Sequence, residues 1–114
     1  MKKYEGVLHM TVRELAKRTD AEILTGDSGT DAEITEGYCC DLLSWAMAHG
    51  KKGMAWITVQ THMNVVAIAV MKGMTCVIAP EHAAFAGDVI AKAREEGIHL
   101  LSTKYNAFEI ARLF

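Results

Sequence analysis

The second half of the chain alternates short apolar runs with segments whose apolar residues recur at helical spacing. The runs at 55–59, 75–79 and 98–101 are each typical of a strand buried in a sheet. Between them the pattern predicts helices at 64–72 and 85–96, which end before Gly73 and Gly97. Crossover helices of this kind join parallel strands. We therefore predict an α/β fold of three layers, α/β/α, with a mainly parallel sheet and helices on both faces.

The first half gives weaker patterns but a clear helix start. Thr11 and Glu14 have the spacing of a capping box, which predicts a helix over 11–18. The other elements expected here, in chain order, are a strand at 21–24, a turn at 26–29, an extended segment at 34–39 and a helix from an N-cap at Asp41 through His49.

Caps and apolar stripes predict which side chains face the core. Asn64 and Asn106 are expected to cap their helices, and Glu109 follows Asn106 at the capping-box position. The side chains expected to face inward are Leu42, Trp45, Ala46 and His49 in one helix, Phe85, Val89, Ile90 and Ala93 in another, Phe108, Ala111 and Phe114 at the end, and the methionines Met47, Met71 and Met74.

Length and composition indicate one domain. The chain has 114 residues, 51% of them apolar, and we expect residues 11–114 to form the domain, with 1–10 as an extension or an edge strand. The formal charge is −2 and the basic residues are scattered, which gives nucleic-acid binding no electrostatic support. No apolar run approaches the roughly 20 residues that span a membrane, and the start lacks a secretory core. We expect a cytoplasmic protein.

Cysteine and histidine spacing predicts neither a disulfide framework nor a metal site. Cys39 and Cys40 are adjacent, Cys76 is a third, and the five histidines have no metal-type spacing. We therefore expect no metal and no cofactor. Cys39 and Cys40 precede the helix expected from Asp41, whose dipole would lower a thiol pKa. A thiol-dependent enzyme using Cys40 or His62 is one hypothesis, although burial as a small apolar residue is the commoner role of such a cysteine.

Two polar loops follow predicted strands and are the candidate ligand site. In parallel sheets ligands bind beyond the carboxyl ends of the strands, close to helix N-termini with free amides. One loop follows the strand at 55–59 and the other follows the strand at 98–101, so we expect both to open at the same edge. The candidate ligand-binding residues are Gln60, Thr61, His62, Asn64, Ser102, Thr103 and Lys104. The alternative for both loops is ordinary capping and hydrogen bonding within the loops.

Short catalytic motifs are absent from the sequence. It contains no GxxxxGK[ST], GxGxxG, GxSxG or HExxH, the common signatures of nucleotide hydrolysis, dinucleotide binding, serine hydrolysis and zinc proteolysis. We therefore expect a protein that is not an enzyme. The two remaining hypotheses are a regulatory module that binds a small anion, and an assembly scaffold that binds protein through an apolar face without a ligand.

The segments CDLLSWAMAHGKKGMAWITVQTHMNVVAIAVMKGMTCVIA and EEGIHLLSTKYNAFEIARLF resemble the DRTGG domain family, in particular its stand-alone members. The resemblance covers about residues 11–114. It implies a fold like the amino-terminal domain of HPr kinase/phosphorylases, and a regulatory, homodimeric module linked in CBS-containing pyrophosphatases to adenine nucleotides. Because stand-alone members occur near genes for iron hydrogenases, it also implies a redox enzyme such as an iron hydrogenase as partner.

The chain departs from the family at the motif that names it. Gln60 to Asn64, QTHMN, stand where the family has an Asp-Arg-Thr-Gly-Gly run. The arginine that could clasp a phosphate with two hydrogen bonds is missing, and so are the glycines that allow close backbone approach. The kinase and pyrophosphatase activities belong to other domains and do not carry over.

Overall fold

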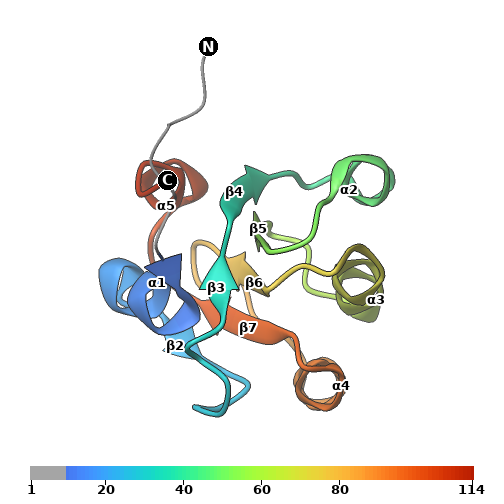
Figure 1. The fold of residues 1–114 in the computed structure, drawn as a ribbon, viewed down its shortest axis with the longest axis horizontal. Helices are drawn as coiled ribbons and strands as arrows, with labels where there is room; N and C mark the ends of the chain where they lie inside the picture. Colours follow the sequence, from blue (N-terminus) through green and yellow to red (C-terminus); the bar gives the residue numbers. More distant parts are fainter. Residues whose placement is uncertain (1–9) are drawn as a thin grey trace.

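Five strands form the central sheet in the spatial order β2-β7-β6-β5-β4 (Figure 1). The structure is a computed structural model and describes residues 10–114. Strands β4 to β7 are parallel to their neighbours, whereas β2 is antiparallel to β7. The strands are β2 Glu22–Ile23, β4 Glu36–Cys39, β5 Met54–Ile57, β6 Cys76–Ala79 and β7 His99–Ser102. The predicted α/β fold with a mainly parallel sheet is confirmed.

A second, two-stranded sheet involves the start of the described chain. Strand β1 (Met10–Thr11) is antiparallel to β3 (Glu33–Ile34), with Met10 opposite Ile34. Met10 is therefore part of a strand, while residues 1–9 of the expected extension or edge strand lie outside the described residues. The extended segment expected at 34–39 is divided between β3 and β4.

Helices cover both faces of the central sheet (Figure 1). The apolar side chains of β5 alternate between the faces: Trp56 packs with α2, α3 and α4, and Ile57 packs with α1 and α5. This division into two cores confirms the three layers. The helices are α1 Val12–Thr19, α2 Leu43–His49, α3 Met63–Lys72, α4 Gly87–Glu96 and α5 Ala107–Ala111. None of these helices in residues 10–114 is long and apolar enough to cross a membrane.

Some of the helix caps predicted from the sequence are confirmed and others are wrong. Thr11 with Glu14, and Asn106 with Glu109, form complete capping boxes at the starts of α1 and α5. Gly73 ends α3 in the left-handed conformation, at φ 70°.

The caps predicted for the helices α2 and α3 are wrong. His62, not Asn64, is the N-cap of α3, and Leu42, not Asp41, is the N-cap of α2. Asp41 has partners outside its own helix, described below.

Several side chains predicted to face the core are exposed instead. Trp45 is 56% exposed in α2, Met71 is 66% exposed in α3 and Phe108 is 71% exposed in α5. Leu42 and Met47 are also exposed, and Ile110 occupies the inward position of α5. For α2 and α5 the reason is geometric, because these helices contain only seven and five residues. A helix with only one or two turns can direct very few side chains toward a sheet, even where more of its residues are apolar.

Candidate functional site

The two predicted ligand loops lie at the same edge of the sheet but are not neighbours. Residues 58–62 follow β5 and residues 103–106 follow β7, and both strands are parallel to β6, which lies between them. The loop after β6, residues 80–86, therefore separates them. As a result, most of the predicted ligand residues are distributed over two hollows.

The first hollow lies between the starts of α3 and α4, and we call it the α3–α4 hollow. Its volume is about 460 Å³. The predicted residues Gln60, Thr61 and His62 line one side, and Ala86 and Asp88 line the other. The lining also includes the apolar side chains of Val59, Met63, Ala84 and Val89. Asn64, the remaining predicted residue of this loop, is exposed in the first turn of α3 and does not line the hollow.

Two helix N-termini meet this hollow, and they differ in charge. The N-cap residue of α3, His62, makes no side-chain cap, and the first turn of α3 contains no acidic residue. The N-cap residue of α4, Ala86, makes no side-chain cap either, but Asp88 lies in its first turn. Asp88 Oδ1 accepts a hydrogen bond from the Val89 backbone N–H at 3.0 Å. The positive end of the α3 dipole is therefore uncompensated, whereas a carboxylate compensates that of α4.

A network around Asp41 fixes the loop that carries Gln60 and His62. The Thr58 hydroxyl donates to Asp41 Oδ1 at 2.8 Å, and the Val59 N–H donates to the same oxygen at 3.0 Å. Gln60 Nε2 donates to the Asp41 carbonyl at 3.1 Å. The side chain of Gln60 is thus engaged within the protein. Sequence reasoning missed this role of Asp41, because its partners are about 17 residues away in the chain.

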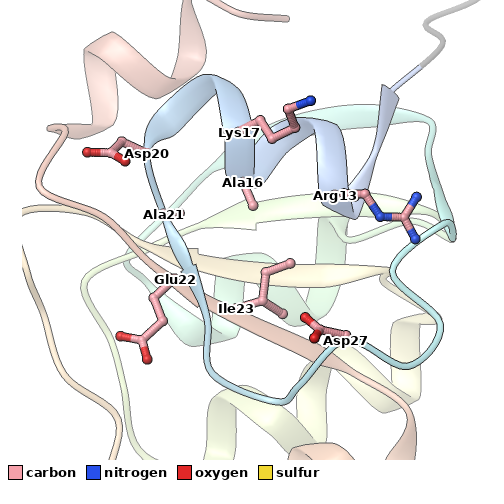
Figure 2. A pocket seen from close by; sticks show the side chains of 8 residues that line it. All are labelled: Arg13, Ala16, Lys17, Asp20, Ala21, Glu22, Ile23 and Asp27. Atoms are coloured by element: carbon pink, nitrogen blue, oxygen red, sulfur yellow. The ribbon is translucent and has the colours of Figure 1, made fainter.

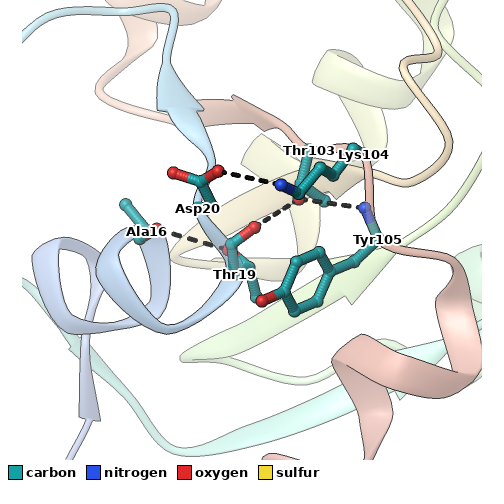
Figure 3. A network of polar contacts seen from close by, with 6 residues as sticks. All are labelled: Ala16, Thr19, Asp20, Thr103, Lys104 and Tyr105. Carbon is teal, nitrogen blue, oxygen red and sulfur yellow. Dashed lines mark hydrogen bonds and ion pairs between the residues drawn. The ribbon is translucent and has the colours of Figure 1, made fainter.

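The second hollow, which we call the Lys104 hollow, has a volume of about 240 Å³. It is lined by Asp20, Glu22, His82, Ser102, Thr103 and Lys104. Lys104 Nζ forms an ion pair with Asp20 Oδ2 at 3.4 Å, and the two side chains are 61% and 74% exposed (Figure 3). Two carboxylates and one ammonium group therefore line this hollow. An anion that approaches Lys104 must compete with Asp20 and is repelled by Glu22.

The other two predicted residues of the Lys104 hollow bind groups of the protein itself. Thr103 is buried, its hydroxyl donates to the Thr19 carbonyl, and it accepts the Tyr105 N–H at 3.2 Å (Figure 3). Ser102 Oγ donates to the Ala83 carbonyl at 3.2 Å. Thr103 thus joins the end of α1 to the loop before α5 and is not free for a ligand.

A third hollow, unexpected from the sequence, lies between α1 and the edge strand β2 (Figure 2). Its volume is about 470 Å³. Arg13 and Lys17 come from α1, and Asp20, Glu22 and Asp27 bring opposite charge to the same surface. Arg13 Nη2 donates to the Thr30 hydroxyl at 2.9 Å. The mixture of charges favours no single class of small ligand.

The cysteines give little support to thiol chemistry. The pKa of Cys39 is raised, first by burial and then by the charge of Asp41, which is opposite to the expected effect of a helix N-terminus. Burial raises the pKa of Cys76 to about 12. Cys40 Sγ donates to the Leu42 carbonyl at 3.3 Å. Within residues 10–114, no group of three or more His, Cys, Asp or Glu side chains is arranged to hold a metal ion.

Comparison with known proteins finds a likeness of fold. No family model and no curated relative matches the chain. Among solved structures, it is similar to the CBS and DRTGG domains of the regulatory region of a Clostridium perfringens pyrophosphatase, complexed with its activator diadenosine tetraphosphate. The TM-score is 0.76 at 12% identity, over 90% of this chain and 45% of the other, so this chain spans less than half of that length. The likeness supports a DRTGG-like α/β fold for this chain.

Proposed function

We propose that the protein is a non-catalytic regulatory module that senses an adenine nucleotide or a similar small anion in the α3–α4 hollow. The observation that carries the proposal is the uncapped N-terminus of α3, which opens onto this hollow at the carboxyl edge of the sheet. Free amides and the positive end of a helix dipole bind phosphate readily, and this edge is where ligands bind in parallel sheets.

In this proposal the phosphate binds the first amides of α3, and His62 and Thr61 add side-chain donors. Gln60 shapes the loop through its bond to the Asp41 carbonyl. Asn64 lies in the first turn of α3, where it contributes an exposed amide side chain. The base packs against Val59 and Met63, whose apolar side chains line the hollow.

In this proposal the Lys104 hollow makes little direct contact with the ligand. Ser102 and Thr103 already make hydrogen bonds within the protein, and Lys104 is paired with Asp20. Lys104 therefore contributes long-range attraction to an anion, screened by salt, more than a direct contact. Binding should accordingly depend strongly on His62 and weakly on Lys104.

A protein of similar fold suggests adenine nucleotides as the first ligands to test. The pyrophosphatase regulatory region of similar fold is complexed with diadenosine tetraphosphate, an activator of that enzyme. A regulatory module acts through a partner, and we propose a homodimer that acts on a redox enzyme such as an iron hydrogenase.

A second candidate function, assembly without a ligand, is favoured by an apolar groove that lies further along α3 and α4 than the α3–α4 hollow does. The groove has a volume of about 330 Å³ and is lined mainly by Met63, Val66, Ala67, Val70 and Met71. Exposed apolar surface of this kind is typical of protein interfaces. Under this hypothesis, Met71→Glu abolishes self-association or partner binding, and every nucleotide is silent.

Isothermal titration calorimetry with AMP, ADP, ATP and diadenosine tetraphosphate tests the proposed function. The informative variant is His62→Asn. Asparagine is a good N-cap, so the variant should be more stable than wild type by about 1 kcal/mol. The asparagine oxygen would accept from a backbone N–H at the start of α3 and so compete with the phosphate for it. Binding should weaken about tenfold or more, since hydrogen bonds to charged groups are worth roughly 1.5–3 kcal/mol.

The matched control is His82→Asn, an exposed loop histidine in the Lys104 hollow at φ 59°, a conformation that asparagine tolerates. This variant should bind like the wild type. Wild-type protein that binds none of the four nucleotides at millimolar concentration, or equal loss of binding in both variants, contradicts the proposal.

A further inference from the structure

The two sides of the α3–α4 hollow carry opposite electrostatic character. On one side, the uncapped start of α3 has no acidic residue in its first turn. On the other side, Asp88 is exposed at the start of α4 and lines the hollow. A phosphate is attracted to the first side and repelled by the second. The hollow therefore suits a ligand with an anionic end and a neighbouring group that donates hydrogen bonds.

Asp88 retains an acceptor for such a group. Its Oδ1 accepts the Val89 N–H at 3.0 Å, which fixes the orientation of the carboxylate. Among residues 10–114, Oδ2 has no hydrogen-bond or ion-pair partner. An ionised carboxylate only accepts hydrogen bonds, and acidic side chains accept them from ribose hydroxyls in dinucleotide-binding folds, so Oδ2 can accept from a sugar hydroxyl.

We infer that Asp88 binds the ribose hydroxyls of the ligand and makes the hollow selective for ribonucleotides over deoxynucleotides. The inference rests on the proposed function. In a nucleotide the sugar lies between phosphate and base. A phosphate on α3 and a base against Val59 and Met63 bring the sugar to the middle of the hollow, within reach of the α4 side. Sites built around a sugar hydroxyl discriminate well, because a ligand without it leaves a polar group unpaired.

A nucleotide that lacks the ribose hydroxyls tests this role of Asp88. Calorimetry compares AMP with 2′,3′-dideoxy-AMP, which keeps the phosphate and the base. Wild-type protein should bind AMP about tenfold more tightly, the range expected for a hydrogen bond to a charged group. In Asp88→Ala, the two ligands should bind with nearly equal affinity, because binding of AMP falls and binding of the dideoxy compound does not.

The control is Glu95→Ala, which removes an exposed carboxylate from the same helix without touching the hollow. It should keep the wild-type preference for AMP, and thermal unfolding checks that both variants are folded. Equal binding of the two ligands by wild-type protein, or a preference that persists in Asp88→Ala, overturns the role of Asp88 and leaves the proposed function intact. Absence of binding by either ligand overturns both.

Discussion

Replacing Asp41 tests how the loop between β5 and α3 is held. Asp41 Oδ1 accepts two hydrogen bonds, from the Thr58 hydroxyl at 2.8 Å and from the Val59 N–H at 3.0 Å. Thr58 is only 1% exposed, whereas Val59 is partly exposed, so water can replace the partner of Val59 more easily than that of Thr58. Most of the effect of Asp41→Ala should therefore come from the buried hydroxyl.

The magnitude follows from the cost of a buried donor without its acceptor, about 1–3 kcal/mol. We expect Asp41→Ala to lower the free energy of unfolding by about 2 kcal/mol, which lowers Tm by about 8 °C in a domain of this size. Asp41→Asn keeps an acceptor oxygen but loses the charge, and should cost about 1 kcal/mol. Thr58→Val removes the donor itself, so the pair Asp41→Ala and Thr58→Val should be strongly non-additive.

Urea unfolding followed by circular dichroism measures these differences. Asp31→Ala is the matched control, because Asp31 is an exposed turn aspartate, and surface substitutions change stability by about 0.5 kcal/mol or less. A loss from Asp41→Ala no larger than that of the control, or additive effects with Thr58→Val, refutes the argument that this network fixes the loop.

Three further predictions concern other parts of the fold. Trp56→Phe removes the indole N–H that donates to the Cys40 carbonyl at 2.8 Å, and denaturant unfolding should show a loss of about 2 kcal/mol. Burial lowers the pKa of His99 below its ordinary 6.5, opposed by a backbone hydrogen bond to Gly29, so its neutral form favours the folded state. Stability should be full above pH 6.5 and fall below it, and a pH series of unfolding curves should be flatter in this range for His99→Gln than for wild type. Asp20→Asn breaks the exposed ion pair with Lys104 and should change thermal stability by less than about 0.5 kcal/mol; a larger change would contradict the view that this pair is a surface contact.

The sequence predicts the layers of this fold well because they depend on local periodicity. The alternation in β5 assigns Trp56 and Ile57 to opposite faces, and the capping box at Thr11 and Glu14 depends on residues only three apart. Such signals are contained within single elements. They survive in the structure because the local preference and the tertiary packing agree.

The candidate site was predicted less completely because it depends on strand order. Both polar loops were expected at the carboxyl edge, but no local pattern places β6 between β5 and β7, and the loop 80–86 therefore separates Gln60 from Lys104. Asp41 shows the same limit. Its position predicts a helix cap, but Leu42 is the N-cap of α2, and the Asp41 carboxylate accepts from Thr58 and Val59 in the loop after β5, which the sequence alone does not reveal.

The most direct test of the account is a titration of the ¹⁵N-labelled full chain with AMP, observed in amide-correlated NMR spectra. Binding in the α3–α4 hollow predicts the largest shifts at the amides of residues 61–65 and 84–89, where the uncapped α3 and the start of α4 meet. Shifts confined to residues 20–22 and 102–105, or no shifts at millimolar AMP, would contradict it.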